Sequence, residues 1–305
     1  MSTPPVTVVG ESLVDLVLRP GDTEPVEHPG GSPANVSVGL SRLDHAPTLL
    51  TRLGEDERGE LVARHLRDNG VDVRSSVAPR TSTALARLDE RGSATYEFDL
   101  DWDVADLRVP GGTGLLHVGS LAAVLAPGAE TVQSMVRDAA RAGNVLISYD
   151  PNVRPTITPD RDSVREHVLR TAAHAHIVKC SEEDLEFLFP GTPPEALPQM
   201  FAEAALVAVT HGGDGVFWAT DHHTGTLAPP QIEMVDSVGA GDAFMAGLLD
   251  GALRAGVGPR SLDALADEAA TEQIMRRATT VAAITCARAG ANPPTTAEVD
   301  DALAA

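Results

Sequence analysis

Short apolar segments recur along this chain of 305 residues, and each is followed at once by glycine or a polar cluster and then by a helical pattern. The segments are residues 6–10, 48–54, 114–120, 144–150, 176–184 and 206–215. Short continuous apolar strands that alternate with helices are typical of a parallel sheet covered on both faces. The sequence therefore predicts an α/β fold with a mostly parallel central sheet flanked by helices.

In a sheet of this kind, ligands bind beyond the carboxyl ends of the strands. Polar or small residues follow several of the predicted strands, and they are Gly10, Asp150, Lys179, Thr210, Gly212 and Gly213. Because the carboxyl ends of parallel strands share one edge, we expect the functional site at this edge.

Two segments depart from the alternation. Residues 13–21 continue extended past the first strand, and residues 83–101 alternate as two strands around a turn at residues 89–92. They predict a small β lid formed by about residues 13–29 and 83–108, with an edge hairpin of no function as the alternative. The chain has no internal repeat and no long linker, so one domain over residues 1–305 is expected.

The chain is strongly acidic, with a net charge of -21. Such a charge disfavours nucleic acid and anionic membranes as partners. Lys179 is the only lysine among 23 basic residues, which we interpret as a coding bias. Cys180 and Cys286 have no metal-type spacing, and the amino terminus has no signal-peptide pattern. A cytoplasmic location is the expectation.

The segment VDSVGAGDAFMAGLLDG continues as an apolar helix that begins near Gly239–Asp242. The first amides of a helix lack internal partners and, with the helix dipole, form an anion site. Gly239, Ala240 and Gly241 are small enough to let an anion approach the backbone. Asp242 beside it could deprotonate a hydroxyl that attacks phosphorus. The alternative is a tight turn in which Asp242 is an ordinary helix-capping acid.

A second glycine-rich loop, GGSPANVSVGLSRL, precedes another helix. Ser32 is the expected N-cap, Pro33 the first helical residue, and Asn35 lies in the first turn. There Asn35 would face the mouth of the helix, where a neutral donor and acceptor suits a polyol. A plain capped helix start is the alternative.

Together these motifs resemble those of the ribokinase-like (PfkB) carbohydrate kinases. The family pattern Asp-x-x-Gly-Ala-Gly-Asp is matched from Asp236 to Asp242, and its amino-terminal signature by the Gly-Gly loop, Asn35 and RLGEDERG. The likeness covers nearly the whole chain. It implies a Rossmann-like sheet with a β lid, ATP-dependent phosphorylation of a sugar hydroxyl, and a requirement for Mg²⁺.

The resemblance also implies residue roles. Asp242 would be the catalytic base, and the hole for the transferred phosphoryl would be formed by Gly239, Ala240 and Gly241. The residues implied to hold the sugar are Asp15, Gly30, Gly31, Asn35 and Asp242. Those implied to lie along the nucleotide are Thr210, Gly212, Gly213, Gly239 and Gly241. Arg154 matches an arginine near the substrate or phosphates, a task that suits its planar charged fork, with a local turn and ion pair as the alternative.

Metal sites follow the family pattern less closely. The family's Asn-x-x-Glu appears here as Ser181-Glu182-Glu183-Asp184, which implies water-mediated Mg²⁺ contact through Glu183 or Asp184. A solvated acidic first turn of a helix is the alternative. The resemblance further implies a monovalent cation such as K⁺ beside the anion hole. Its expected ligands come from Asp236, Val238, Thr285, Arg288 and Gly290.

Within the family, the segments GGSPANVSVGLSRL, HVGS and YDPNVRP are most similar to bacterial fructokinases. Leu13 stands where ribokinases carry an asparagine that contacts ribose. The leading expectation is therefore phosphorylation of D-fructose to fructose 6-phosphate. The alternatives are a 2-keto-3-deoxygluconate kinase, a ribokinase, a nucleoside kinase, or a non-catalytic sensor of sugar or nucleotide. The resemblance also suggests a homodimer through the lids.

Overall fold

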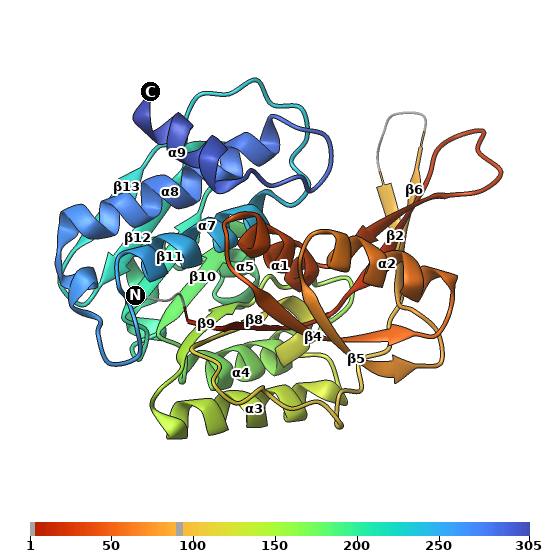
Figure 1. The fold of residues 1–305 in the computed structure, drawn as a ribbon, viewed down its shortest axis with the longest axis horizontal. Coiled ribbons are helices and arrows are strands. Elements are labelled where there is room, and N and C mark those ends of the chain that lie inside the picture. Colours follow the sequence, from red (N-terminus) through yellow and green to blue (C-terminus); the bar gives the residue numbers. More distant parts are fainter. Residues whose placement is uncertain (1–3, 90–93) are drawn as a thin grey trace.

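A nine-stranded sheet forms the centre of the computed structural model, which describes residues 4–89 and 94–305 (Figure 1). The strand order is β13-β12-β11-β10-β9-β8-β1-β4-β5. The strands are β1 (Val6–Val9), β4 (Pro47–Gly54), β5 (Asp72–Ala78), β8 (Leu115–Gly119), β9 (Leu146–Asp150), β10 (Ile177–Ser181), β11 (Leu206–Thr210), β12 (Val216–Thr220) and β13 (Thr224–Leu227). All neighbours from β5 to β11 pair in parallel, and β12 and β13 add an antiparallel edge. The predicted α/β fold is confirmed.

Helices cover both faces of the sheet (Figure 1), and each face buries its own apolar cluster. One face carries α1 (Ser32–Arg42), α2 (Glu57–Asp68), α7 (Ala240–Arg254), α8 (Glu268–Cys286) and α9 (Thr296–Ala304). The other carries α3 (Gly128–Ala142), α4 (Arg161–Ala172), α5 (Glu182–Leu188) and α6 (Leu197–Met200). Short 3₁₀ turns lie at Ser120–Ala123, Pro194–Ala196, Gly212–Asp214 and Asp263–Ala266.

Helix α7 is fixed firmly in this arrangement. Its residues from Ala243 to Ala252 are all buried, as expected for a helix that is apolar on every side. A Cβ on Gly247 would lie 2.9 Å from the Cα of Ala278, so only glycine lets α7 pack this closely on α8. The amino end of α7 is therefore held rigidly over the carboxyl edge of the sheet.

A separate four-stranded sheet projects from the body at the right of Figure 1. Its order is β3-β2-β6-β7, and its strands are β2 (Leu13–Leu18), β3 (Val26–Gly30), β6 (Thr83–Leu88) and β7 (Ala94–Asp99). The predicted turn at 89–92 falls, apart from Asp89, outside the described residues. Beyond β7 the chain returns to the body, where Trp102 is buried and its indole donates to the carbonyl of Ala122.

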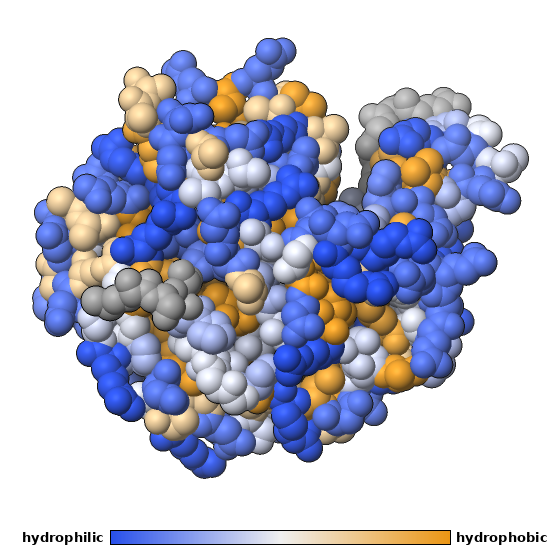
Figure 2. Space-filling view, viewed as in Figure 1, coloured by the Kyte–Doolittle hydropathy of each residue, from blue (hydrophilic) through white to orange (hydrophobic). Residues whose placement is uncertain are grey.

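The face drawn in Figure 2 is covered mostly by hydrophilic residues, as the net charge of -21 leads one to expect. Among the described residues, none of the helices combines the length and the apolar character that crossing a membrane would require.

Candidate active site

The amino end of α7 presents free backbone donors. Gly239 precedes the helix in the left-handed conformation, with φ 74, and its carbonyl accepts from the amide of Ala243 at 2.8 Å. The amide of Ala240 donates to the carbonyl of Ser237 at 3.2 Å. None of the hydrogen bonds of the described residues uses the amides of Gly241 or Asp242. These two amides, at the positive end of the helix dipole, are therefore available to an anion.

Two residues of α1 hold the carboxylate of Asp242. Its Oδ1 accepts from the hydroxyl of Ser32 at 2.6 Å, and its Oδ2 accepts from Nδ2 of Asn35 at 2.8 Å. The prediction that Ser32 caps α1 and Pro33 begins it was wrong, because α1 begins at Ser32 and Gly31 is the N-cap. The Ser32 hydroxyl donates a hydrogen bond to Asp242 and accepts none from the amides of its own helix. The amino ends of α1 and α7 thus face each other.

A pocket of about 450 Å³, here called the Asp242 pocket, opens beside this contact. Its polar lining includes the predicted residues Asp15, Gly31, Asn35, Arg154 and Asp242. Gly30 makes room for one of them, since a Cβ at that position would lie 2.0 Å from Oδ2 of Asp15. Burial raises the pKa of Asp15 to about 6, and Asp242 adds to the rise.

Arg154 and the lid complete the walls of the Asp242 pocket. The guanidinium of Arg154 donates to the carbonyls of Asn152 at 3.3 Å and Val153 at 3.1 Å, and the side chain stays largely exposed. From β7 of the lid, Tyr96 and Phe98 reach the same pocket and stack with ring centroids 6.0 Å apart. Tyr96 is 58% exposed, so its ring is free to pack against a ligand that enters the pocket.

A second pocket, of about 560 Å³ and here called the Thr210 pocket, lies on the other side of the α7 amino end. It contains the predicted Thr210, Gly212 and Gly213, and an apolar wall that includes Ile232, Met234 and Phe244. The two pockets meet at one short stretch of backbone. Gly239 and Asp242 line the Asp242 pocket, whereas Ala240 and Gly241 line the Thr210 pocket. A group held in one pocket can therefore be passed to a ligand in the other across the free amides.

Sequence reasoning missed Glu11, which lies two residues after the end of β1 and lines the Asp242 pocket. Its side chain is buried, and its Oε2 has no hydrogen-bond partner. Burial raises the pKa of Glu11 to about 7, although a hydrogen bond from the side chain of Ser120 and the charge of Arg154 oppose the rise. Ser120 itself has φ 56, a conformation that non-glycine residues adopt mainly at functional sites. The only sequence signal was the position of Glu11 at the carboxyl end of a predicted strand.

Replacing Glu11 with glutamine is expected to stabilise the protein at pH 8 and to change little at pH 4.5. A carboxyl whose folded-state pKa is raised contributes stability below its unfolded pKa and loses it as the pH rises through the folded pKa. For Glu11 that window runs from 4.5 to about 7. The gain of Glu11→Gln at pH 8 is on the order of 3 kcal/mol in the free energy of unfolding.

Urea unfolding of both proteins at pH 4.5 and pH 8 measures this difference. Glu203→Gln serves as the matched control, because Glu203 is exposed and its replacement should give the same small effect at both pH values. A gain from Glu11→Gln that does not depend on pH would contradict the raised pKa of Glu11.

The acidic run predicted to contact Mg²⁺ begins α5. Asp184 is buried, and its Oδ2 accepts from the amide and hydroxyl of Ser181 at 2.8 Å each. Its Oδ1 accepts from the amide of Val153 at 2.7 Å. Asp184 thus completes the capping box of its own helix, in which Ser181 is the N-cap, whereas Glu183 is exposed. Among the described residues, no group of three or more metal-binding side chains is gathered.

The residues predicted to bind a monovalent cation lie in the loop before α7, in the last turn of α8 and in the loop after α8, and Asp236 joins the two loops. Its Oδ1 accepts from the amide of Val238 at 3.0 Å and its Oδ2 from the amide of Gly290 at 2.8 Å. These two backbone hydrogen bonds lower the pKa of Asp236. The carbonyl of Thr285 accepts from the amide of Arg288 at 3.0 Å. The structure brings the predicted loops together, and the cation site stays a prediction.

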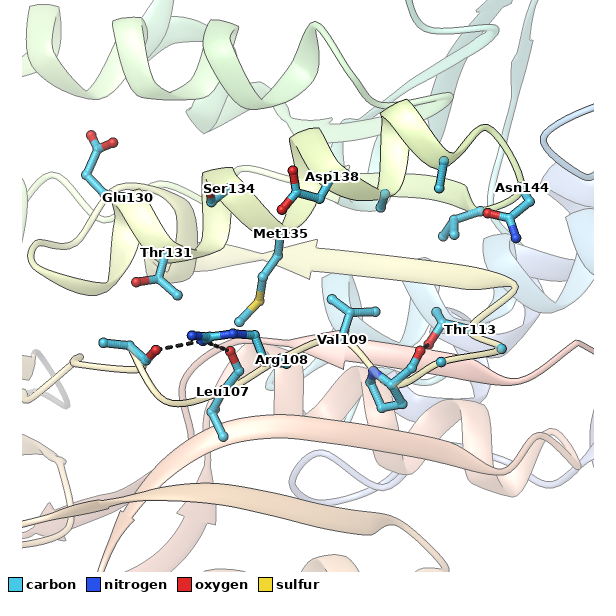
Figure 3. Close-up of a pocket in the computed structure, with 17 residues that line it drawn as sticks. Leu107, Arg108, Val109, Thr113, Glu130, Thr131, Ser134, Met135, Asp138 and Asn144 are labelled. Atoms are coloured by element: carbon cyan, nitrogen blue, oxygen red, sulfur yellow. Dashed lines mark hydrogen bonds between the residues drawn. The ribbon is translucent and has the colours of Figure 1, made fainter.

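A third cavity, of about 690 Å³, lies between α3 and the segment before β8 (Figure 3). Thr113 and Asn144 line it, and they precede β8 and β9, so the cavity is at the amino edge of the sheet. Arg108 donates to the carbonyls of Ala105 and Leu107 and is turned to its own loop (Figure 3). Ligands of parallel sheets bind at the opposite edge, which carries the Asp242 and Thr210 pockets.

Known proteins share both the sequence and the fold. The sequence profile described as pfkB family carbohydrate kinase matches residues 4–298. A fructokinase from Klebsiella pneumoniae is 34% identical over 280 residues, covering 88% of this chain and 90% of its own. Fructokinase from Xylella fastidiosa, solved with bound ATP, is 25% identical with a TM-score of 0.90 and 99% of each chain covered.

A double mutant of fructokinase from Vibrio cholerae O395, solved with fructose, ADP and a potassium ion, is 27% identical. Its TM-score is 0.80, and the similarity covers 99% of each chain. The matched segment includes the whole Asp242 pocket and the whole Thr210 pocket. The chain belongs to the pfkB family of carbohydrate kinases.

Proposed function

We propose that this protein is an ATP-dependent sugar kinase that places the sugar in the Asp242 pocket and ATP in the Thr210 pocket. The observation that carries this assignment is the meeting of the two pockets at the free amides of Gly241 and Asp242. Polar groups converge on one side, and an apolar wall that suits a flat base lies on the other. Relatives solved with bound ATP, or with fructose and ADP, support a site that takes both a sugar and a nucleotide.

The reaction is a transfer of the terminal phosphoryl group. The attacking hydroxyl oxygen of the sugar forms a bond to the γ-phosphorus while the bond from that phosphorus to the β–γ bridging oxygen breaks. Asp242 takes the hydroxyl proton, and ADP leaves with the electron pair of the broken bond. The free amides at α7 stabilise the negative charge on the transferred group, which is the role of fixed dipoles in such sites. Ser32 and Asn35 keep the Asp242 carboxylate turned toward the pocket.

We further propose that Mg²⁺ accompanies ATP and that a monovalent cation binds between the Asp236 and Gly290 loops. Mg²⁺ retains several waters and favours phosphate oxygens, so Glu183, which is exposed, would reach it through water. It would neutralise phosphate charge during transfer. The joined loops support the monovalent cation, and potassium accompanies the Vibrio cholerae relative. A homodimer through the lid sheets stays a prediction from the family resemblance.

D-Fructose is the proposed acceptor, and its product is fructose 6-phosphate. The fructokinase relatives support this choice. We expect fructose to give the highest kcat/KM in a panel with 2-keto-3-deoxygluconate, ribose and adenosine, measured by coupled detection of ADP. A higher kcat/KM for another member of the panel would reassign the acceptor. Absence of ADP formation with every member would favour the non-catalytic sensor.

A further inference from the structure

Lys179 departs from the composition of this chain, in which every other basic residue is arginine. Arginine carries a broad planar fork, whereas lysine carries a compact point charge on a flexible stem. A coding bias accounts for the arginines, but it leaves the retained lysine unexplained. The position of Lys179 indicates why a compact cation is needed there.

The side chain of Lys179 is 3% exposed and extends from β10 to the underside of the α7 amino end. A Cβ built on Gly241 would lie 3.4 Å from its Nζ, so the ammonium lies directly behind the free amides. Nζ donates to Oδ2 of Asp150 at 2.9 Å, and Oδ1 of Asp150 is buried without a hydrogen-bond partner. An arginine fork would have to displace Gly241 or Asp150.

The charges around Lys179 keep it protonated. Burial would lower the pKa of Lys179, but Asp150, Asp184 and Asp242 together raise it above its usual value. A buried pair such as Lys179 and Asp150 is rarely favourable for stability, because desolvation of both charges offsets their attraction. The position of the Lys179 ammonium gives a better explanation of the pair. The ammonium faces the place where the terminal phosphate of ATP must lie under the proposed function.

We propose that Lys179 is a positioning residue of phosphoryl transfer: its ammonium, held by Asp150, places a fixed positive charge behind the amides of Gly241 and Asp242. This inference rests on the proposed function of the site. The ammonium keeps its proton throughout and acts by adding its field to that of the α7 dipole. The arrangement strengthens the binding site for the transferred phosphoryl group at the amino end of α7, and it does so without an additional side chain in either pocket.

The double variant Lys179→Met with Asp150→Asn tests the role of the charge. The single change would leave a buried carboxylate without its partner, whereas the double variant is neutral and similar in shape. We expect the double variant to keep its melting temperature and the KM for sugar within threefold, and to lose about 30-fold in kcat, which corresponds to roughly 2 kcal/mol. A kcat within threefold of the wild type would overturn the proposal.

A buried pair that joins α7 and α8 provides the control. Asp250 lies near the carboxyl end of α7 and pairs with Arg277, and it also contacts His45 and Arg254. Neither Asp250 nor Arg277 lines the Asp242 pocket or the Thr210 pocket. Asp250→Asn with Arg277→Met should lower stability and leave kcat within threefold, because the pair does not face the phosphate. An equal loss of kcat in both double variants would show that any buried pair matters to turnover, and it would also overturn the proposal.

Because Lys179 is the only lysine, labelling lysine with ¹³C and ¹⁵N gives one ammonium signal from the whole chain. We expect this signal to shift when ADP with aluminium fluoride is added to the wild-type protein, and to stay in place with fructose alone. An unchanged signal would overturn the inference even if the double variant failed to fold. Wild-type turnover is measured in parallel. An inactive wild type would refute the proposed function, whereas an active one with a silent lysine would refute only this inference.

Discussion

Asp242→Asn is expected to lower kcat by roughly 10³-fold while leaving the fold and ADP binding intact. The amide cannot take the proton of the attacking hydroxyl. It can preserve the local contacts, because its oxygen still accepts from Ser32, and Asn35 can turn its own amide to accept from the new N–H group. Steady-state kinetics with fructose and ATP, calorimetric titration with ADP, and thermal unfolding measure the three properties.

Ser32→Ala is the matched control for this experiment. It removes the donor 2.6 Å from Oδ1 but leaves the carboxylate and its contact with Asn35. We expect a loss of kcat of about tenfold at most, which is the effect of misplacing the base slightly. If Asp242→Asn kept more than a tenth of the wild-type kcat, another group would have to be the base.

The sequence predicted those parts of the fold that depend on local patterns. Buried parallel strands require continuous apolar runs, so β1, β4, β8, β9, β10 and β11 could be located before the structure was known. Strand β5 was missed because it is an edge strand that is mostly exposed and partly polar, so it has no continuous apolar run. The start of α7 could also be predicted from a local pattern, because a glycine, which is left-handed in the structure, and small residues precede an apolar helix.

Contacts between distant segments could not be predicted in the same way. The hydrogen bond from Ser32 to Asp242 joins positions 210 residues apart, and a helix-start pattern gave Ser32 a different role. Glu11 has no local pattern at all. Its significance comes from burial in a pocket formed by α1, α7, the lid and the segments after β8 and β9, and burial of this kind depends on the packed fold. The sequence could indicate that the site lies at the carboxyl edge of the sheet, but not which distant residues contact one another there.

The charges at this edge explain how a chain with a net charge of -21 can bind phosphates. Burial raises the pKa of Glu11 to about 7, so this carboxyl carries only part of its negative charge near neutral pH, and the charge of Asp150 is paired with Lys179. The charge of Lys179 and the α7 dipole act at the meeting point of the two pockets. Under the proposed function, the protein's attraction for the nucleotide therefore comes mainly from the free amides of α7 and from Lys179 behind them.

Gly239→Ala is expected to lower kcat by about 10²-fold or more, because it misplaces the free amides. Gly239 has φ 74, and an added Cβ would lie 2.7 Å from Cβ and 3.1 Å from Cα of Ala291. The neighbouring backbone leaves no room, so the loop before α7 must shift. Since Gly239 also accepts the first hydrogen bond of the helix, from Ala243, the shift would be passed to Gly241 and Asp242.

Gly256→Ala is the control that separates displacement of the free amides from the effect of backbone strain alone. Gly256 follows the carboxyl end of the same helix with φ 79, and an added Cβ would meet nothing within 4 Å. Gly256→Ala should lose about 1–2 kcal/mol in the free energy of unfolding, which is the cost of a left-handed alanine, and Gly239→Ala should lose at least as much. Only Gly239→Ala should lose kcat, measured with fructose and ATP at saturation. If the two variants had the same kcat, the position of the α7 amino end would not control phosphoryl transfer, and the Asp242 side chain alone would have to account for catalysis.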